Sequence, residues 1–167
     1  MPLIKYGQIA ADPWHSVADG DELPAHEPVI VSLERWRQDR ALLLAREADV
    51  GVRLASKDQA ADIAADLTHL KLVALEFPTF RDGRAYTTAR LLRERHHFDG
   101  ELRAVGNVLR DQLLFMHRCG FDAFEIDDDQ AIATWIKAID EMSVFYQPTG
   151  DGRRTVLQVR SMQRAAE

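Results

Sequence analysis

The chain has 167 residues, which is long enough for one domain with a substantial apolar core. It carries 21 Lys and Arg against 27 Asp and Glu, a net charge of −6. This charge argues against a nucleic-acid or anionic-membrane binder, because such partners need a cationic face. The single cysteine excludes an internal disulfide and the set of thiolates that holds an ordinary iron–sulfur cluster.

Residues 1–27 are rich in turn-forming pairs. These pairs are Asp12-Pro13, Asp19-Gly20 and Leu23-Pro24. We expect an N-terminal extension there, with a short strand or hairpin, ahead of a main domain over residues 28–147. The first residues lack the apolar run of a secretory signal, and no window approaches the ~18 apolar residues of a membrane span. The sequence therefore favours a cytoplasmic protein with no membrane partner.

The main domain alternates short apolar, β-branched runs with longer segments of helical period. The expected strands are 29–33, 51–55, 72–77, 101–105 and 122–126. The expected helices are 34–47, 57–70 with Ser56 as its cap, 84–97, a helix from Asn107 or Val108 to Arg118, and 130–145. Five such units require parallel strands joined by crossover helices. We predict an α/β fold with about five mostly parallel strands in an open sheet, or alternatively a partial (β/α) barrel.

The last residues, 148–167, are expected to form a tail beyond the domain. Thr149–Gly152 has the composition of a plain turn or linker. The β-branched residues of Thr155–Val159 predict one strand in this otherwise frayed segment.

Polar side chains follow the third and fourth expected strands, at the edge where α/β sheets generally bind ligands. The candidates for binding a small anion or a polar substrate are Asp82, Arg84, Asn107, Arg110, Asp111 and Gln112. Asp82 and Asn107 are equally suited to cap the helices that follow them, since their side-chain oxygens accept from free backbone N–H groups. Both roles stay open.

The charge of this region supports an anion site. Residues 77–120 contain eight Arg and five acidic residues, a balance of +3, while the remainder of the chain carries −9. Arginine suits bidentate recognition of carboxylate, phosphate or sulfur oxyanions. The alternative is internal ion pairing of Arg90, Arg93 and Arg95 with Glu94, Asp99 and Glu101.

Other reactive side chains give weaker signals. Cys119 lies at an expected helix end, where a thiolate is not favoured, so we interpret it as a packed residue. No carboxylate stands at a zinc-like spacing from His96 and His97, and we expect no metal site. Asp127–Asp129 predicts a solvated loop, with a magnesium site as the minor alternative. No Gly-x-Gly-x-x-Gly follows a strand, so we expect no nicotinamide, flavin or other cofactor.

Several blocks of the chain resemble the signature of a bacterial family of unknown function, whose members are commonly described as probable oxidoreductases involved in sulfite reduction. The blocks are Phe77–Tyr86, Ala89–Arg95, Phe98–Gly106, Val108–Leu113 and Arg118–Phe124. The resemblance implies association with sulfite reductase in sulfur assimilation, without an assigned catalytic residue. The family pattern usually has Asp at this position, where the present chain has Asn107. The amide lacks the negative charge of a carboxylate, which argues against a general base or metal ligand at Asn107.

Physical chemistry limits what this resemblance can mean. Reduction of sulfite to sulfide needs a haem-type centre coupled to an iron–sulfur cluster, and one cysteine cannot hold that cluster. We therefore expect an accessory protein of assimilatory sulfite reduction that associates with the reductase or its electron donor. The alternative is an enzyme or sensor that binds a small anionic ligand at the carboxyl edge of the sheet.

Overall fold

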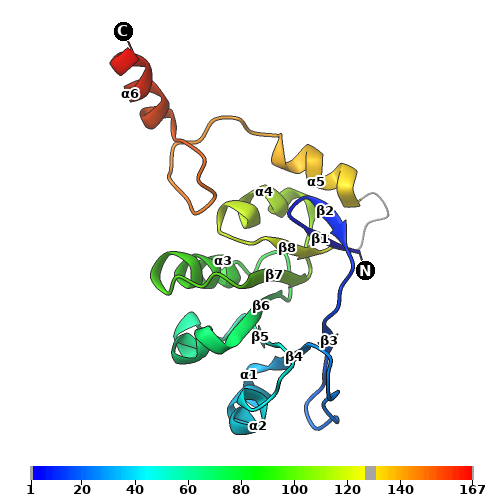
Figure 1. Cartoon of the computed structure of the whole chain (residues 1–167). Helices are drawn as coiled ribbons and strands as arrows, with labels where there is room; N and C mark the ends of the chain where they lie inside the picture. Colours follow the sequence, from blue (N-terminus) through cyan, green and yellow to red (C-terminus); the bar gives the residue numbers. More distant parts are fainter. Residues whose placement is uncertain (1, 127–130, 167) are drawn as a thin grey trace.

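The computed structural model describes residues 2–126 and 131–166. Within these residues the chain forms one eight-stranded sheet in the order β2-β1-β8-β7-β6-β5-β4-β3 (Figure 1). The strands are β1 (Leu3–Lys5), β2 (Gln8–Ala10), β3 (His15–Ser16), β4 (Val29–Ser32), β5 (Val50–Leu54), β6 (Leu70–Phe77), β7 (Glu101–Gly106) and β8 (Ala123–Glu125).

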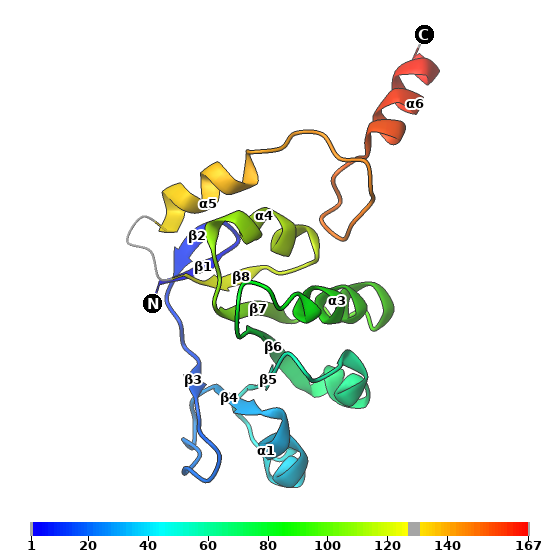
Figure 2. The same cartoon turned by 180° about the vertical axis from the view of Figure 1, so that it is seen from behind.

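The five expected strands are β4 to β8, and they lie side by side in chain order and in parallel. The prediction of an open, mostly parallel sheet is confirmed. The sheet is strongly curled, so that it forms an arc of a barrel (Figures 1 and 2). Because every crossover moves one place in the same direction, the connecting helices lie on one face. These helices are α1 (Leu33–Gln38), α2 (Arg40–Leu44), α3 (Arg84–Arg90) and α4 (Arg110–Arg118).

The main core lies between this helical face and the sheet. Alternate residues of the strands point to the helices, as the period of a strand requires. Fully buried examples are Val29, Val31, Val52, Val73, Leu102 and Phe124, which share one cluster with Trp36, Leu92 and Leu113 of the helical layer. Ser32 caps α1 by accepting a hydrogen bond from the Arg35 N–H at 3.0 Å, which fixes the direction in which the chain leaves β4.

The expected helix over 57–70 is wrong. The chain forms two 3₁₀ turns there, Ala60–Asp62 and Ala64–His69. Short acidic side chains explain the difference, because Asp58 accepts from the Ala55 N–H at 2.9 Å and Asp62 accepts from the Gln59 N–H at 2.8 Å. Such local bonds compete with a regular helix.

The N-terminal segment crosses the open face of the sheet. The β1–β2 hairpin, which the sequence predicts within residues 1–27, pairs antiparallel with β8 at one edge. β3 pairs in parallel with β4 at the other edge, so residues 11–14 span the face between them (Figure 1). Trp14 packs there against a small apolar cluster of Ile30, Leu72, Ala74 and Val105. We call residues 11–14 the strap.

The C-terminal part contains two further helices. α5 (Ala131–Ile139) packs against α4 and the β1–β2 hairpin, and α6 (Val156–Ala166) follows a long connection. The strand expected over Thr155–Val159 is wrong, because Thr155 starts a helix. Its Oγ1 accepts from the Gln158 N–H at 3.3 Å while the Gln158 Oε1 accepts from the Thr155 N–H at 2.8 Å. This reciprocal capping stabilises the start of the helix and outweighs the preference of the β-branched side chains for a strand.

Two points concern the limits of the described chain. The acidic loop Asp127–Asp129, considered above as a solvated loop or magnesium site, lies outside the described residues. Among the helices that the structure does describe, none combines the length and the apolar character needed to cross a bilayer.

Candidate functional site

Asp82 and Arg84 form one local unit at the start of α3. The guanidinium of Arg84 donates to the Asp82 carboxylate from Nε at 2.9 Å and from Nη2 at 2.6 Å. It also donates to the Ser56 hydroxyl at 2.9 Å. These bonds from Arg84 hold the pKa of Asp82 well below its usual range. Asp82 accepts from the Arg84 N–H at 3.3 Å as well, but Gly83 occupies the N-cap position of α3, so the capping interpretation of Asp82 is wrong.

The remaining candidates lie around the start of α4. Arg110 Nη1 is 3.6 Å from the Asp111 carboxylate, and its Nη2 is 3.6 Å from that of Glu141. Gln112 is buried, and its Oε1 accepts from the N–H of Leu109 at 3.1 Å, closing the helix terminus.

Asn107 has a backbone role instead of a capping role. Its N–H donates to the Phe77 carbonyl at 2.7 Å, while α4 begins only at Arg110. The capping interpretation of Asn107 is therefore wrong. Across residues 2–126 and 131–166, no hydrogen bond or ion pair joins the Asp82–Arg84 unit to Asn107, Arg110, Asp111 or Gln112.

Internal ion pairing accounts for much of the arginine in segment 77–120. Arg90 binds Glu94 at 2.9 Å, as the pairing alternative predicted. Arg93 instead binds Asp122 at 2.9 Å and donates to the carbonyls of Phe98, Gly100 and Gly120. This side chain therefore joins the end of the α3 segment to the chain before β7 and β8, a structural role.

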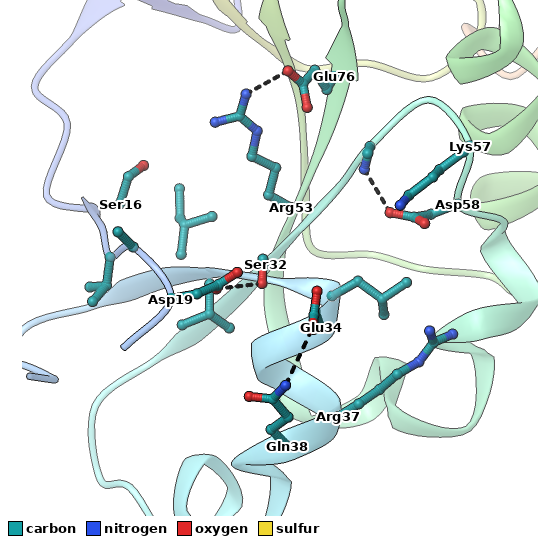
Figure 3. Close-up of a pocket in the computed structure, with 16 residues that line it drawn as sticks. Ser16, Asp19, Ser32, Glu34, Arg37, Gln38, Arg53, Lys57, Asp58 and Glu76 are labelled. Atoms are coloured by element: carbon teal, nitrogen blue, oxygen red, sulfur yellow. Dashed lines mark hydrogen bonds and ion pairs between the residues drawn. The ribbon is translucent and has the colours of Figure 1, made fainter. Parts of the chain in front are cut away.

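A cleft of about 850 Å³ opens at the carboxyl ends of β4, β5 and β6 (Figure 3). Its walls are residues 16–19 at the end of β3 and after it, α1, the residues Ala55, Lys57 and Asp58 after β5, and the end of β6 at Glu76. The volume is in the range of small-molecule sites, and the position is the edge that α/β folds generally use. In the described part of the chain, the six sequence candidates do not line it.

Side chains of the cleft are held by a few specific contacts. Arg53 at the end of β5 binds Glu76 of β6, with Nη2 2.8 Å from Oε1. The Ser32 hydroxyl donates to Asp19 at 2.7 Å, which ties the loop after β3 to the start of α1. Lys57 extends from the far side of the same space (Figure 3). The sequence signal for this site is the pair of charged residues, Arg53 and Glu76, near the carboxyl ends of mostly apolar strands.

Cys119 and its surroundings offer no reactive thiol. The side chain is buried, as expected for a packed residue, and burial raises the pKa of the thiol to about 11. Burial also lowers the pKa of nearby His117, whose ring packs edge-on against Trp135 at 5.6 Å. Among the described residues, no three or more His, Cys, Asp or Glu side chains gather as metal ligands would.

The connection before α6 is anchored firmly to α4. Phe145 is buried beneath the guanidinium of Arg118, which lies 3.9 Å from the ring centroid. Arg118 Nε also donates to the buried Asp151 carboxylate at 3.3 Å, and Thr149 donates to the same carboxylate at 2.9 Å. The base of α6 is thus fixed by specific contacts.

Beyond this base, α6 extends away from the body of the protein (Figure 2). Its apolar side chains are exposed, with Leu157 at 70%, Val159 at 42% and Met162 at 49%. Residues 153–164 carry four arginines and no acidic residue, a charge of +4, whereas the rest of the chain carries −10. We call residues 153–166 the C-terminal arm.

The sequence of the chain matches a known protein family. Residues 51–157 match the profile of a bacterial protein family of unknown function, DUF934. The chain belongs to the DUF934 family. No curated protein matches it.

The DUF934 match begins in β5 and ends at the second residue of α6. It includes Arg53, Lys57 and Glu76 on one side of the cleft, and it includes the anchored connection that precedes α6. Residues 16–19, β4 and α1, which complete the cleft, lie ahead of the matched region.

Proposed function

We propose that this DUF934 protein is an accessory component of assimilatory sulfite reduction, and that it associates with sulfite reductase or the reductase's electron donor. The resemblance to proteins described as oxidoreductases of sulfite reduction supplies the process. The observation that carries an accessory role is α6, a capped helix on a fixed base whose apolar side chains are exposed.

The arrangement of α6 fits docking into a partner groove. Val156, Val159 and Met162 follow each other at three-residue spacing, which puts them along one side of the helix. A helix of 11 residues gains little stability in water without packing partners. Insertion of its apolar stripe into a groove would supply that packing.

Charge indicates which kind of groove would accept the arm. Four arginines over residues 153–164 favour an acidic rim around an apolar floor, since opposite charges speed association and fix orientation. The remainder of the chain, at −10, would repel an anionic membrane surface. The charges therefore favour a protein partner whose acidic surface is confined to the groove that receives the arm.

Pull-down of the full chain with purified sulfite reductase, and separately with its purified electron donor, tests this proposal. We expect one of the two to be retained and the rate of electron delivery to sulfite to change when the protein is added. Retention of neither, together with an unchanged rate, would overturn the proposal.

The cleft favours a second candidate function, an enzyme or sensor for a small ligand at the carboxyl edge of the sheet. Its size and its position at the ends of β4, β5 and β6 support this function. A thermal-shift screen with sulfite, sulfate, phosphate and polar metabolites tests it, and no stabilisation by any of them would contradict it.

A further inference from the structure

The charges around the cleft do not suit a simple anion. Seven ionisable side chains line it, four of them acidic: Asp19, Glu34, Asp58, Glu76, Arg37, Arg53 and Lys57. Their formal sum is −1. The cleft therefore weakly repels a bare oxyanion such as sulfate or sulfite and does not concentrate it. A ligand that also carries a positive group would complement both signs of charge in this lining.

Existing ion pairs neutralise part of this set. Arg53 binds Glu76 at 2.8 Å, and Arg37 turns to Asp62, a residue beyond the cleft lining, at 2.7 Å. Lys57 makes no ion pair with any residue that the structure describes. Asp58 accepts from the Ala55 N–H and so fixes the loop that carries Lys57. Among the described residues, Lys57 is therefore a cation without an ion pair on the β5 side of the cleft, where Asp58, its neighbour in the chain, balances its formal charge.

The β4 side carries the opposite charge. Asp19 accepts only from the neutral Ser32 hydroxyl, and Glu34 accepts only from the Gln38 amide at 3.3 Å, within the described chain. In Figure 3, Asp19 and Lys57 lie on opposite sides of the cleft, with Glu34 below Ser32. Carboxylates that lack a cationic partner face an ammonium ion across the space that a ligand would fill.

We propose that the cleft binds a small zwitterion of the amino-acid class, with its ammonium group toward Asp19 and Glu34 and its carboxylate toward Lys57. The proposal rests on the second function given above and names its ligand class. Arg53 would assist at the carboxylate end, because its Nε and Nη1 donate to no described residue while Nη2 holds Glu76. Such a ligand complements both sides of the cleft, and the roughly 300–1,000 Å³ typical of small-molecule sites includes this volume.

Isothermal titration of the full chain tests this inference. The probes are the common L-amino acids, matched carboxylic acids that lack the amine, matched amines that lack the carboxylate, and sodium sulfate and sulfite. We expect at least one amino acid to bind and its matched acid and amine to bind about tenfold more weakly or not at all, as expected when one charged contact is lost.

Variants locate the binding site. Lys57→Ala and Glu34→Gln should each weaken binding of the amino acid by about tenfold or more, while Arg90→Ala, on α3 away from the cleft, should leave it unchanged. If sulfate or sulfite binds and no amino acid does, the zwitterion proposal is overturned and the second function is retained. Absence of binding by every probe would overturn both, and amino-acid binding that both cleft variants retain would place the site elsewhere.

Discussion

Asp12 of the strap binds Arg103 of β7 with both carboxylate oxygens, at 2.7 Å from Nη1 and 2.9 Å from Nη2. The Arg103 side chain is only 1% exposed, and it also binds Glu101 at 2.7 Å and Glu125 at 3.2 Å. A buried guanidinium needs such partners because burial without them carries a large desolvation cost. The strap therefore completes a charge network on the open face of the sheet.

Replacing Asp12 by Asn should weaken the fold. The variant removes the charge that the strap presents to Arg103, while Glu101 and Glu125 remain. We expect the free energy of unfolding, measured by urea denaturation, to fall by about 1–2 kcal/mol, a value reduced because Asp12 is partly exposed. Asp99→Asn, at an exposed acidic residue, is the matched control and should change little. Equal midpoints for the two variants would contradict the role of the strap.

The contribution of Asp12 should depend on pH. Burial tends to raise the pKa of this carboxyl group, but the hydrogen bonds from Arg103 outweigh it and the pKa is lowered. A carboxyl whose pKa is lower in the folded state stabilises the protein above its unfolded pKa of about 4, and this stability is lost as the pH falls through the folded value. The difference in unfolding free energy between wild type and Asp12→Asn should therefore shrink from neutral pH toward pH 3. A constant or growing difference would argue against stabilisation by the charged form of Asp12.

Gly106, at the end of β7, should not tolerate a side chain. Its φ is +88°, and an added Cβ would lie 2.7 Å from the Phe77 carbonyl oxygen. Gly106→Ala is expected to cost about 1–3 kcal/mol, which calorimetric or urea unfolding would measure. Gly150→Ala is the control, because a Cβ there meets nothing within 4 Å. Similar stability of the two variants would show that this strand end is less constrained than the geometry indicates.

Cys119 should be protected from alkylation in the folded protein. The thiolate is the reacting form, and burial raises the pKa of this thiol to about 11. Mass spectrometry after iodoacetamide treatment near pH 8 should find the folded chain unmodified and the urea-unfolded chain modified once. Rapid modification of the folded chain would show that the thiol is accessible and would reopen a redox role.

The sequence predicted the five central strands well because each is an apolar, β-branched run between turn signals. Their order and curl depend on contacts between segments distant in the sequence, and neither follows from periodicity. The errors at 57–70 and at α6 have local causes, since Asp58, Asp62 and Gln158 bind nearby backbone groups and so decide the conformation.

The candidate site was harder to predict than the fold. Its general place, the carboxyl edge of the sheet, follows from the α/β pattern. The cleft itself also needs residues 16–19, which reach the edge of β4 only because the strap crosses the whole sheet. Asp82 and Arg84 looked like ligand contacts in the sequence, but in the structure they bind each other.

The central claim, docking of the arm on a component of sulfite reduction, is tested most directly by the affinity of the full chain for purified sulfite reductase and for its electron donor. The account predicts binding to one of them that weakens with salt and falls at least about tenfold in a Val159→Asp, Met162→Asp variant of unchanged melting temperature. Leu42→Asp, at an exposed apolar residue of α2, should bind normally. Binding to neither protein, or equal binding by the arm variant, would contradict the account.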